Sequence, residues 1–510
     1  MRKQRRTGNS ILRAVVVALS LLFQVGWMLL MALRLNEYSA WISLGTSVLS
    51  LIIVLRLYNK HTTAAMKLPW IMLIMAFPVM GISLYLMIIA FGDLGSSGKR
   101  LKKIRRDIAP MVEQSPETLE ALASSAGELS GLCRYLWQNN HSPVYENTSV
   151  RYFPWGAEAF EALKEELRRA ESFIFMEYFI IRDVSSFQEI RDILVQKVRQ
   201  GVEVRLMYDD VGSVGYVNLK FAKQLNDLGI QCRVFNPALP VLNLFLNHRD
   251  HRKITVIDGK VGFTGGYNLS DEYFDRTRPY GLWKDTGIRL EGEAVQGLTA
   301  TFLELWNASD WKAEDYETYL GVQHSVKTDG FVQPFGDSPL GEERVMENVL
   351  LHLIFRAKKS LYVMTPYLII TEEMNRALGL AAKRGVDVRI ITPGIPDKKT
   401  VFAMTRSYYA QLVSQGVRIY EYTPGFCHAK QCICDGEVVV IGTSNLDYRS
   451  LYLHFENNVL LFGSEAVGRI AQDFTATFAQ CREVTEDYRT GRGKILLTWQ
   501  YLLRLFSPMV

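Results

Sequence analysis

Two stretches of the chain carry the same polar side chains at the same spacing. "HRKITVID" begins at His251 and "HAKQCICD" begins at His428, and both read His-x-Lys-x-x-x-x-Asp. A Gly follows each Asp, and an Asn lies 17 positions after each His. The shared residues are His251, Lys253, Asp258 and Asn268 in the first copy and His428, Lys430, Asp435 and Asn445 in the second.

These residue types point to phosphate chemistry. Side chains alternate between the two faces of a strand, so His251 and Lys253 share one face. An imidazole, an ammonium and an amide can hold a phosphate while the imidazole attacks it or protonates its leaving group. The doubled pattern therefore indicates a phosphate-processing site rather than two ordinary hairpins.

The Asp-Gly pair in each copy predicts a hairpin turn. Asp258 and Asp435 each stand, with the Gly that follows, between two β-like runs, and Asp-Gly favours a two-residue turn. In that register Ile257 pairs with Lys260. The same alternation puts Asp258 on the face opposite His251, so we expect it to shape the turn rather than to touch a substrate.

Each histidine also needs a carboxylate that fixes its tautomer. "DTGIRLEGEAV" from Asp285 resembles "ENNVLLFGSEAV" from Glu456, and each acid follows a histidine motif and opens an expected strand. We expect Asp285 to orient His251 and Glu456 to orient His428.

The chain after residue 107 repeats itself. "SFIFMEYFII" from Ser172 is echoed by "SLYVMTPYLII" from Ser360, and "RQGVEVRLM" is echoed by "KRGVDVRII". Co-linear echoes at a nearly constant offset indicate two copies of one unit. Each copy alternates strands and helices before its histidine motif, which predicts an α/β sheet flanked by helices. We expect a first half over 107–324, and a linker and second half over 325–510.

The first 106 residues predict a membrane anchor. Uncharged runs at 14–33 and 68–91, with a shorter apolar run at 39–55, predict two to three spanning helices, and Pro78 and Gly81 are expected kink points. We therefore expect a multi-pass protein of the cell membrane. The basic run before residue 107 and the cysteines near the second motif favour a catalytic domain that faces the cytoplasm.

Composition excludes several classes of protein. The net charge is +5, and no basic stripe accompanies the motifs, which argues against a nucleic-acid partner. The six cysteines are scattered, without a Cys-x-x-Cys pair or zinc-type spacing, so neither a disulfide framework nor a bound metal is indicated.

The doubled motif resembles the HKD signature of the phospholipase D superfamily, from about residue 130 to the end of the chain. The resemblance is strongest to bacterial cardiolipin synthases, through "NHRDHRKITVIDGKVGFTGGYNLSDEY", "WKDTGIRLEG", "FCHAKQCICDGEVVVIGTSNLDYRSLYLHFENN" and "LLRLFSPMV". One position departs from that pattern: those enzymes often have Asn before the Phe-Glu pair, where this chain has His454.

The resemblance implies two tandem α/β halves that share one active site. It implies that His251 attacks phosphatidylglycerol in the bilayer, releases glycerol and becomes a phosphatidyl-histidine. His428 would protonate the leaving oxygen and then activate a second phosphatidylglycerol, giving cardiolipin without a metal or cofactor. The residues carried over are catalytic His251, Lys253, Asp258, His428, Lys430 and Asp435, and phosphate-binding Asn268 and Asn445.

Three other functions compete with this one. A membrane-bound phospholipase D would use the same residues with water as the acceptor and would release phosphatidic acid. A nuclease of the same superfamily is disfavoured by the apolar N-terminal runs, and a non-enzymatic scaffold is disfavoured by the intact double motif.

Overall fold

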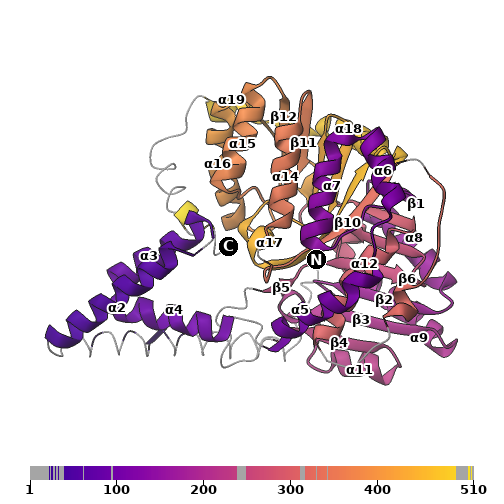
Figure 1. Cartoon of the computed structure of the whole chain (residues 1–510), viewed down its shortest axis with the longest axis horizontal. Coiled ribbons are helices and arrows are strands. Elements are labelled where there is room, and N and C mark those ends of the chain that lie inside the picture. Colours follow the sequence, from indigo (N-terminus) through magenta and orange to yellow (C-terminus); the bar gives the residue numbers. More distant parts are fainter. Residues whose placement is uncertain are drawn as a thin grey trace.

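The apolar runs that repeat along the sequence form two mixed β-sheets, one in each half of the chain (Figure 1). The structure is a computed structural model. It describes residues 40–60, 62–92, 96–237, 248–309, 316–328, 330–341 and 343–489, together with a few positions near each end.

The first sheet has the strand order β1-β9-β7-β6-β2-β3-β4. Its strands are β1 (Thr148–Phe153), β2 (Phe173–Tyr178), β3 (Glu203–Asp209), β4 (Gln231–Phe235), β6 (Lys253–Ile257), β7 (Val261–Gly265) and β9 (Gly287–Gly292). The strands β2, β3 and β4 are parallel, and every other neighbouring pair is antiparallel.

The second sheet has the strand order β10-β17-β16-β15-β11-β12-β13-β18. Its strands are β10 (Phe331–Asp337), β11 (Ser360–Met364), β12 (Asp387–Pro393), β13 (Arg418–Tyr422), β15 (Gln431–Cys434), β16 (Val438–Gly442), β17 (His454–Phe462) and β18 (Cys481–Glu483). Apart from the edge strand β18, order and direction repeat those of the first sheet. The predicted duplication and α/β class are confirmed.

Helices flank both sheets, and the sheets share an apolar core. The helices of the first half are α8 (Gly156–Arg169), α9 (Ser185–Arg199), α10 (Asp210–Ser213), α11 (Phe221–Asp227), η2 (Asp271–Phe274), α12 (Val295–Ser309) and α13 (Glu317–Leu320). Those of the second half are α14 (Val345–Arg356), α15 (Glu372–Lys383), α16 (Lys399–Ser414), α17 (Tyr448–Tyr452), α18 (Glu465–Phe478) and α19 (Thr485–Arg489). One buried cluster contains Phe175 and Ile254 from the first sheet with Ile433 and Leu461 from the second. This common core fixes the halves against each other.

Three helices near the N-terminus form an arm that extends away from the two sheets (Figure 1). They are α2 (Ala40–Tyr58), α3 (Ala64–Ala76) and α4 (Pro78–Gly92). We expected one kinked helix over 68–91. The helix is not continuous, because α3 ends before Phe77 and α4 starts at Pro78, whose missing N–H is tolerated at the first position of a helix. An added Cβ at Gly81 would lie 2.6 Å from the Cα of Ile74, so glycine permits the close turn.

The predicted membrane spans are not reproduced. Within the ranges that the structure describes, no helix combines the length and the apolar character needed to cross a bilayer. The predicted span at 14–33 lies, apart from a few positions, outside the described residues.

The segment between the arm and β1 packs on both halves. It consists of α5 (Ser96–Ile108), η1 (Ala109–Met111), α6 (Pro116–Ser125) and α7 (Gly127–Asn140). On α5, Ile104 is buried in the common core, and Arg105 pairs with Glu304 of the first half at 2.9 Å. On α7, Leu136 is buried in a cluster with Leu353 of the second half. The expected boundary at residue 107 therefore does not match the packing, since helices after it cover the second half.

Both predicted hairpins form, one residue out of the expected register. Asp258 and the Gly after it have φ values of 54° and 66°, and the N–H of Lys260 donates to the carbonyl of Ile257 at 3.0 Å. Pairing of the strands then resumes with Ile257 opposite Val261, not Lys260. The second hairpin has the same geometry.

Candidate active site

A short parallel pairing between the halves positions the first histidine. Strand β5 (Arg249–Asp250) leads into His251 and pairs with the start of β17, which leads into Glu456. The N–H of His251 donates to the carbonyl of Phe455 at 2.9 Å. This register places His251 directly opposite Glu456, although 205 residues separate them.

A second parallel pairing does the same for the other histidine. Strand β14 (Gly425–Cys427) leads into His428 and pairs with β8 (Leu282–Lys284), which leads into Asp285. The N–H of His428 donates to the carbonyl of Lys284 at 2.7 Å. The two parallel pairings, β5 with β17 and β14 with β8, have the same arrangement. Together they bring both motifs to one place between the halves.

Each histidine is oriented by the carboxylate of the other half. The Nδ1–H of His251 donates to the two oxygens of Glu456 at 2.9 and 3.0 Å, and the Nδ1–H of His428 donates to Asp285 at 2.6 Å. Both carboxylates are fully buried. The two acids were predicted, but our assignment of partners was wrong: it followed chain order, whereas the parallel pairings exchange the partners between halves.

The two carboxylates are accommodated differently. A Cβ on Gly266 would lie 2.0 Å from Oδ1 of Asp285, so only glycine allows the backbone to approach this short acid. The position 177 residues later, the spacing between the two histidines, is Thr443, whose hydroxyl donates to Oε2 of Glu456 at 2.5 Å. The longer acid thus accepts a hydrogen bond from a hydroxyl, whereas Oδ1 of the shorter acid lies against a glycine and accepts from the backbone N–H of Thr286 at 2.9 Å.

Two buried lysines lie beside the histidines. The ammonium of Lys253 donates to the carbonyl of His251 and that of Lys430 to the carbonyl of His428, both at 2.5 Å. Burial lowers the pKa of Lys253 to about 7 and that of Lys430 to about 8. Desolvated cations of this kind gain most from an anion that enters the site, as a phosphodiester would.

The histidines are neutral at pH 7. Burial, and after it Lys253, keep the pKa of His251 well below its usual range. Burial and Lys430 lower the pKa of His428 to about 4. Nδ1 of each ring faces a carboxylate, and that of His428 also lies 2.8 Å from Nζ of Lys430. A ring proton on Nδ1 leaves Nε2 with a lone pair that can attack or accept a proton.

Aromatic rings line both histidines. The ring of Phe179 meets His251 edge-on, with ring centres 4.9 Å apart. Against His428 lie Tyr273 and Trp283, with ring centres at 5.4 and 5.3 Å. None of these rings was predicted from the sequence, because nothing in their spacing marks them. They restrict water around the imidazoles, since both histidines are less than a tenth exposed.

The two asparagines have different surroundings. The carbonyl of Asn268 accepts from the N–H of Ile180 at 3.0 Å, and its amide donates to the hydroxyl of Tyr273 at 2.9 Å. Asn268 thus holds one of the rings against His428. Asn445 is buried, and its Oδ1 has no hydrogen-bond partner among the described residues. A phosphate contact by either amide stays a prediction.

The motif aspartates are not brought to the histidines. The carboxylate of Asp258 accepts from the backbone N–H groups of Glu171, Ser172 and Phe173 at 2.7 to 2.9 Å. Asp435 accepts from the equivalent backbone of the second half. Their inclusion among the catalytic residues, which came from the resemblance, is wrong in this geometry, and the expected turn-shaping role agrees with these contacts.

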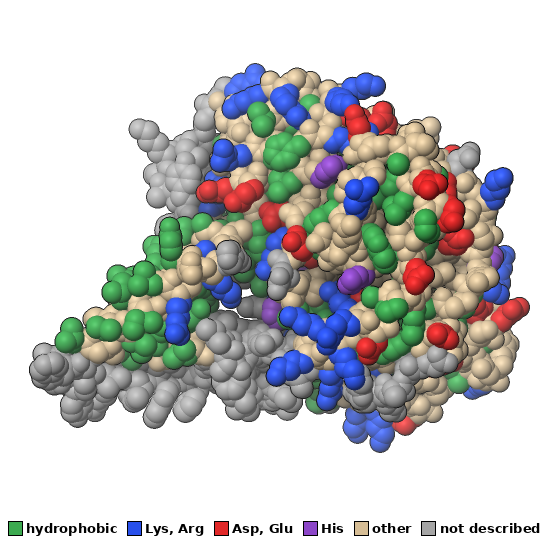
Figure 2. All heavy atoms as spheres, in the orientation of Figure 1, with side chains coloured by type: hydrophobic (Ala, Val, Ile, Leu, Met, Phe, Trp, Pro, Cys, Tyr) green, Lys and Arg blue, Asp and Glu red, His purple; other side chains and the backbone are tan. Residues whose placement is uncertain are grey.

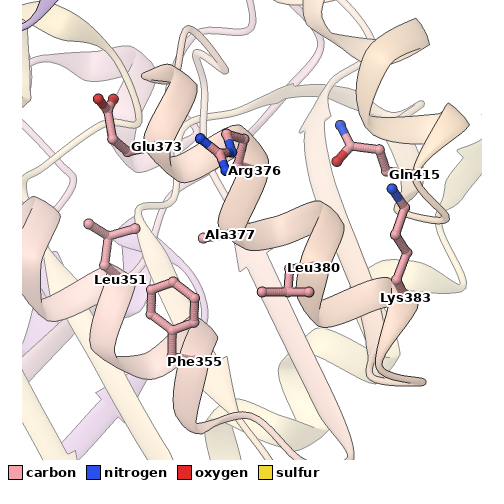
Figure 3. A pocket seen from close by; sticks show the side chains of 8 residues that line it. All are labelled: Leu351, Phe355, Glu373, Arg376, Ala377, Leu380, Lys383 and Gln415. Carbon is pink, nitrogen blue, oxygen red and sulfur yellow. The ribbon is translucent and has the colours of Figure 1, made fainter.

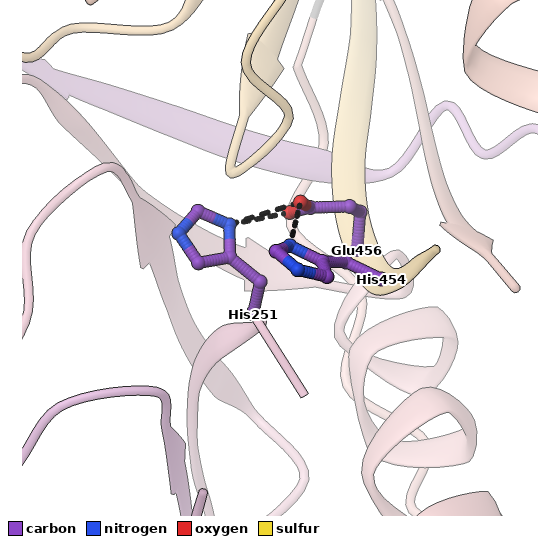
Figure 4. Close-up of side chains that lie close together, drawn as sticks. All are labelled: His251, His454 and Glu456. Atoms are coloured by element: carbon purple, nitrogen blue, oxygen red, sulfur yellow. Dashed lines mark hydrogen bonds and ion pairs between the residues drawn. The ribbon is translucent and has the colours of Figure 1, made fainter. Parts of the chain in front are cut away.

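A third histidine adjoins the first. His454 lies with its ring centre 5.5 Å from that of His251, and its Nδ1 is 3.8 Å from Oε1 of Glu456 (Figure 4). Potential ligand atoms of these three side chains lie within 4.8 Å of one another. The pKa of His454 is lowered by burial and then by Arg449 and Lys253, so the local charge disfavours a divalent cation.

A surface pocket lies elsewhere and contains none of the motif residues. It has a volume of about 660 Å³ between α14 and α15 (Figure 3). Its lining is Leu351, Phe355, Glu373, Arg376, Ala377, Leu380, Lys383 and Gln415. It offers no nucleophile–base pair, so the paired histidines remain the candidate active site.

Comparison with known proteins identifies relatives over most of the chain. A family profile described as "Cardiolipin synthase, PLD-like domain" matches residues 163–306 and 350–480. A cardiolipin synthase of Halalkalibacterium halodurans is 36% identical over 93% of this chain and 95% of its own length. An uncharacterized protein of Streptococcus mutans is 44% identical over 85% of this chain and 94% of its own.

A solved structure shares the fold. The phosphatidylserine synthase of Haemophilus influenzae superposes with a TM-score of 0.55 at 15% identity and covers 74% of this chain and 97% of its own. At that identity the likeness concerns the arrangement of the two sheets alone.

Proposed function

Because the chain belongs to the cardiolipin synthase family with phospholipase D-like domains and is a phosphatidyltransferase, we propose that it transfers a phosphatidyl group between two phosphatidylglycerol molecules through a phosphatidyl-histidine. The observation that carries this proposal is the crossed arrangement of His251 with Glu456 and His428 with Asp285. It joins two equivalent halves into one site with two neutral imidazoles.

In the first step, Nε2 of His251 attacks the phosphorus of phosphatidylglycerol. The N–P bond forms as the P–O bond to glycerol breaks, and His428 gives the leaving oxygen its proton. His428 acquires that proton when the anionic phosphodiester enters, because a nearby negative charge raises the pKa of an imidazole. Glu456 then faces a positively charged phosphatidyl-imidazolium and stabilises it.

In the second step, His428 accepts the proton of a hydroxyl on a second phosphatidylglycerol. That oxygen attacks phosphorus, the N–P bond breaks, and the electron pair returns to His251. The products are cardiolipin and the glycerol released earlier. Throughout, Lys253 and Lys430 neutralise the phosphate oxygens, aided by the amides of Asn268 and Asn445.

The arm formed by α2, α3 and α4 supports attachment to a bilayer. Figure 2 shows hydrophobic side chains along its described surface, and exposed members include Leu44, Val48, Leu51, Leu55, Met72, Met75 and Phe77. Apolar area of this extent on a protruding element favours lipid over water. We place the protein in the cell membrane, held by this arm and by the uncharged segment 14–33.

The active site faces the cytoplasm in this proposal. Cys427, Cys432 and Cys434 near the second motif are free thiols, which suits a reducing compartment. The acceptor is a lipid hydroxyl rather than water, since the histidines and their aromatic neighbours leave little exposed surface.

Incubation with phosphatidylglycerol vesicles tests the function. We expect cardiolipin and glycerol in equal amounts by lipid chromatography and glycerol assay. The matched control is His251→Ala, which should give neither product. Phosphatidic acid in place of cardiolipin would show a phospholipase D, and no turnover by folded protein would contradict enzymatic function.

A further inference from the structure

The two histidines have equivalent positions but different neighbours. Trp283 stands two residues before Asp285 and packs on His428, with ring centres 5.3 Å apart. His454 stands two residues before Glu456 and packs on His251 at 5.5 Å. His428 therefore packs against an indole, whereas His251 packs against an imidazole, which can both donate and accept hydrogen bonds.

The tautomer of His454 is set by an arginine. Nε–H of Arg449 donates to Nε2 of His454 at 3.4 Å. An arginine keeps its protons, so Nε2 must accept and the ring proton of neutral His454 sits on Nδ1. That N–H has no hydrogen-bond partner among the described residues and lies 3.8 Å from Oε1 of Glu456 (Figure 4).

The buried carboxylate of Glu456 needs hydrogen-bond donors if it is to stay ionised. The oxygens of Glu456 receive Nδ1–H of His251 and the hydroxyl of Thr443. Burial raises the pKa of Glu456. A protonated Glu456 would donate to Nδ1 of His251 and leave the proton on Nε2, where it blocks attack on phosphorus. An additional N–H near Oε1 favours the ionised acid and with it the reactive tautomer of His251.

We propose that Arg449 and His454 form a positioning pair that keeps Glu456 ionised and thereby holds His251 in the tautomer that can attack phosphorus. The proposal rests on the proposed function and deepens it. The N–H of His454 closes on Oε1 as substrate binds, because catalytic hydrogen bonds are often long in the free enzyme and tighten in the complex. Position 272, 177 residues before Arg449, is a glutamate that pairs with Arg182, so the first half has an acid where the second half has this arginine.

The test isolates the first chemical step. A phosphatidyl ester of p-nitrophenol has a leaving group that needs no proton, so the burst of nitrophenol reports formation of the adduct. We compare the whole protein with His454→Leu, His454→Asn and Arg449→Gln. The control is Arg469→Gln, which removes an exposed pair with Glu465 remote from the motifs. The burst rate and KM are measured separately.

We expect His454→Leu to lower the burst rate about 10- to 100-fold, as loss of an outer hydrogen-bond partner typically does, with little change in KM. His454→Asn, which restores an N–H, should recover most of the rate, and Arg449→Gln should fall between. Equal losses in the Leu and Asn variants, or a rise in KM with an unchanged burst, would overturn the proposal. Absence of a burst in the unsubstituted protein would instead contradict the proposed function.

Discussion

Glu456→Gln and Asp285→Asn should impair different steps of the reaction. Because Glu456 contacts Nδ1 of His251, the first substitution should slow formation of the phosphatidyl-enzyme. Because Asp285 contacts Nδ1 of His428, the second should spare attack on a substrate whose leaving group needs no proton, and should slow the return step. Pairing by chain order would predict the reverse.

The size of the effect follows from the contacts. His251 reaches both oxygens of Glu456, and Oε2 also accepts the hydroxyl of Thr443. A glutamine amide at that place presents an N–H to Nδ1 or to the threonine and so favours the wrong tautomer of His251. Loss of the orienting carboxylate in a catalytic triad costs about 10⁴-fold for this reason. We expect a loss of roughly 10³- to 10⁴-fold, or about 4 to 5 kcal/mol of activation free energy.

The assay follows the adduct on each protein. After incubation with the nitrophenyl ester and quenching in acid, digestion and mass spectrometry locate the phosphatidyl group. Glu456→Gln should behave like His251→Ala, with little or no adduct on residue 251. Asp285→Asn should behave like His428→Ala, with an adduct on His251 that accumulates. Accumulation in Glu456→Gln and none in Asp285→Asn would refute the crossed assignment.

Three further outcomes follow from the buried charges and turns. KM for phosphatidylglycerol should rise as pH increases through about 7 to 8, because Lys253 and Lys430 then lose the positive charge that attracts the phosphate. A KM that does not change between pH 6 and pH 9 would contradict this. Asp258→Asn should lower the melting temperature by several degrees, because three backbone N–H groups lose a charged acceptor, which costs about 1 to 3 kcal/mol in the free energy of unfolding. The folded fraction should keep its turnover, and lost turnover at full folding would restore a catalytic role. Activity should survive a chelator at constant vesicle charge, and loss that one divalent ion reverses would show a required metal.

The motifs and the sheets could be predicted from local pattern, whereas the pairing across the site could not. The repeat predicted two similar sheets, because each half carries the same apolar runs in the same sequence, and the strand order is indeed shared by the two halves. The crossing depends on β5 and β14, pairings of two and three residues that have no periodicity to detect. Chain order made Asp285 the natural partner of His251, and only the relative placement of the halves reverses that choice.

Details finer than a helix or strand could not be predicted from the sequence either. The Asp-Gly pairs predicted turns, but strand pairing resumes at Val261 and not at Lys260, because the turn absorbs one more residue than the two-residue form. The kink at Pro78 was predicted and the break in the helix was not, since packing of α3 on α4 decides between them. Hydrophobicity alone does not distinguish a long helix from two packed ones.

A duplicated fold starts with two equal histidines, yet the reaction needs one nucleophile and one acid. The motifs cannot supply that difference, because both contain His, Lys and Asn at one spacing. The difference lies in what surrounds them. Beside His251 are a glutamate, the hydroxyl that donates to it and a third imidazole, and beside His428 are an aspartate, the backbone N–H that donates to it and an indole. The hydroxyl of Thr443, together with the N–H of His454 in the proposed closed contact, would keep the buried Glu456 charged opposite a phosphatidyl-imidazolium. We therefore expect the division of labour to follow from residues outside the repeated motif, above all from the imidazole that packs on His251 and the indole that packs on His428.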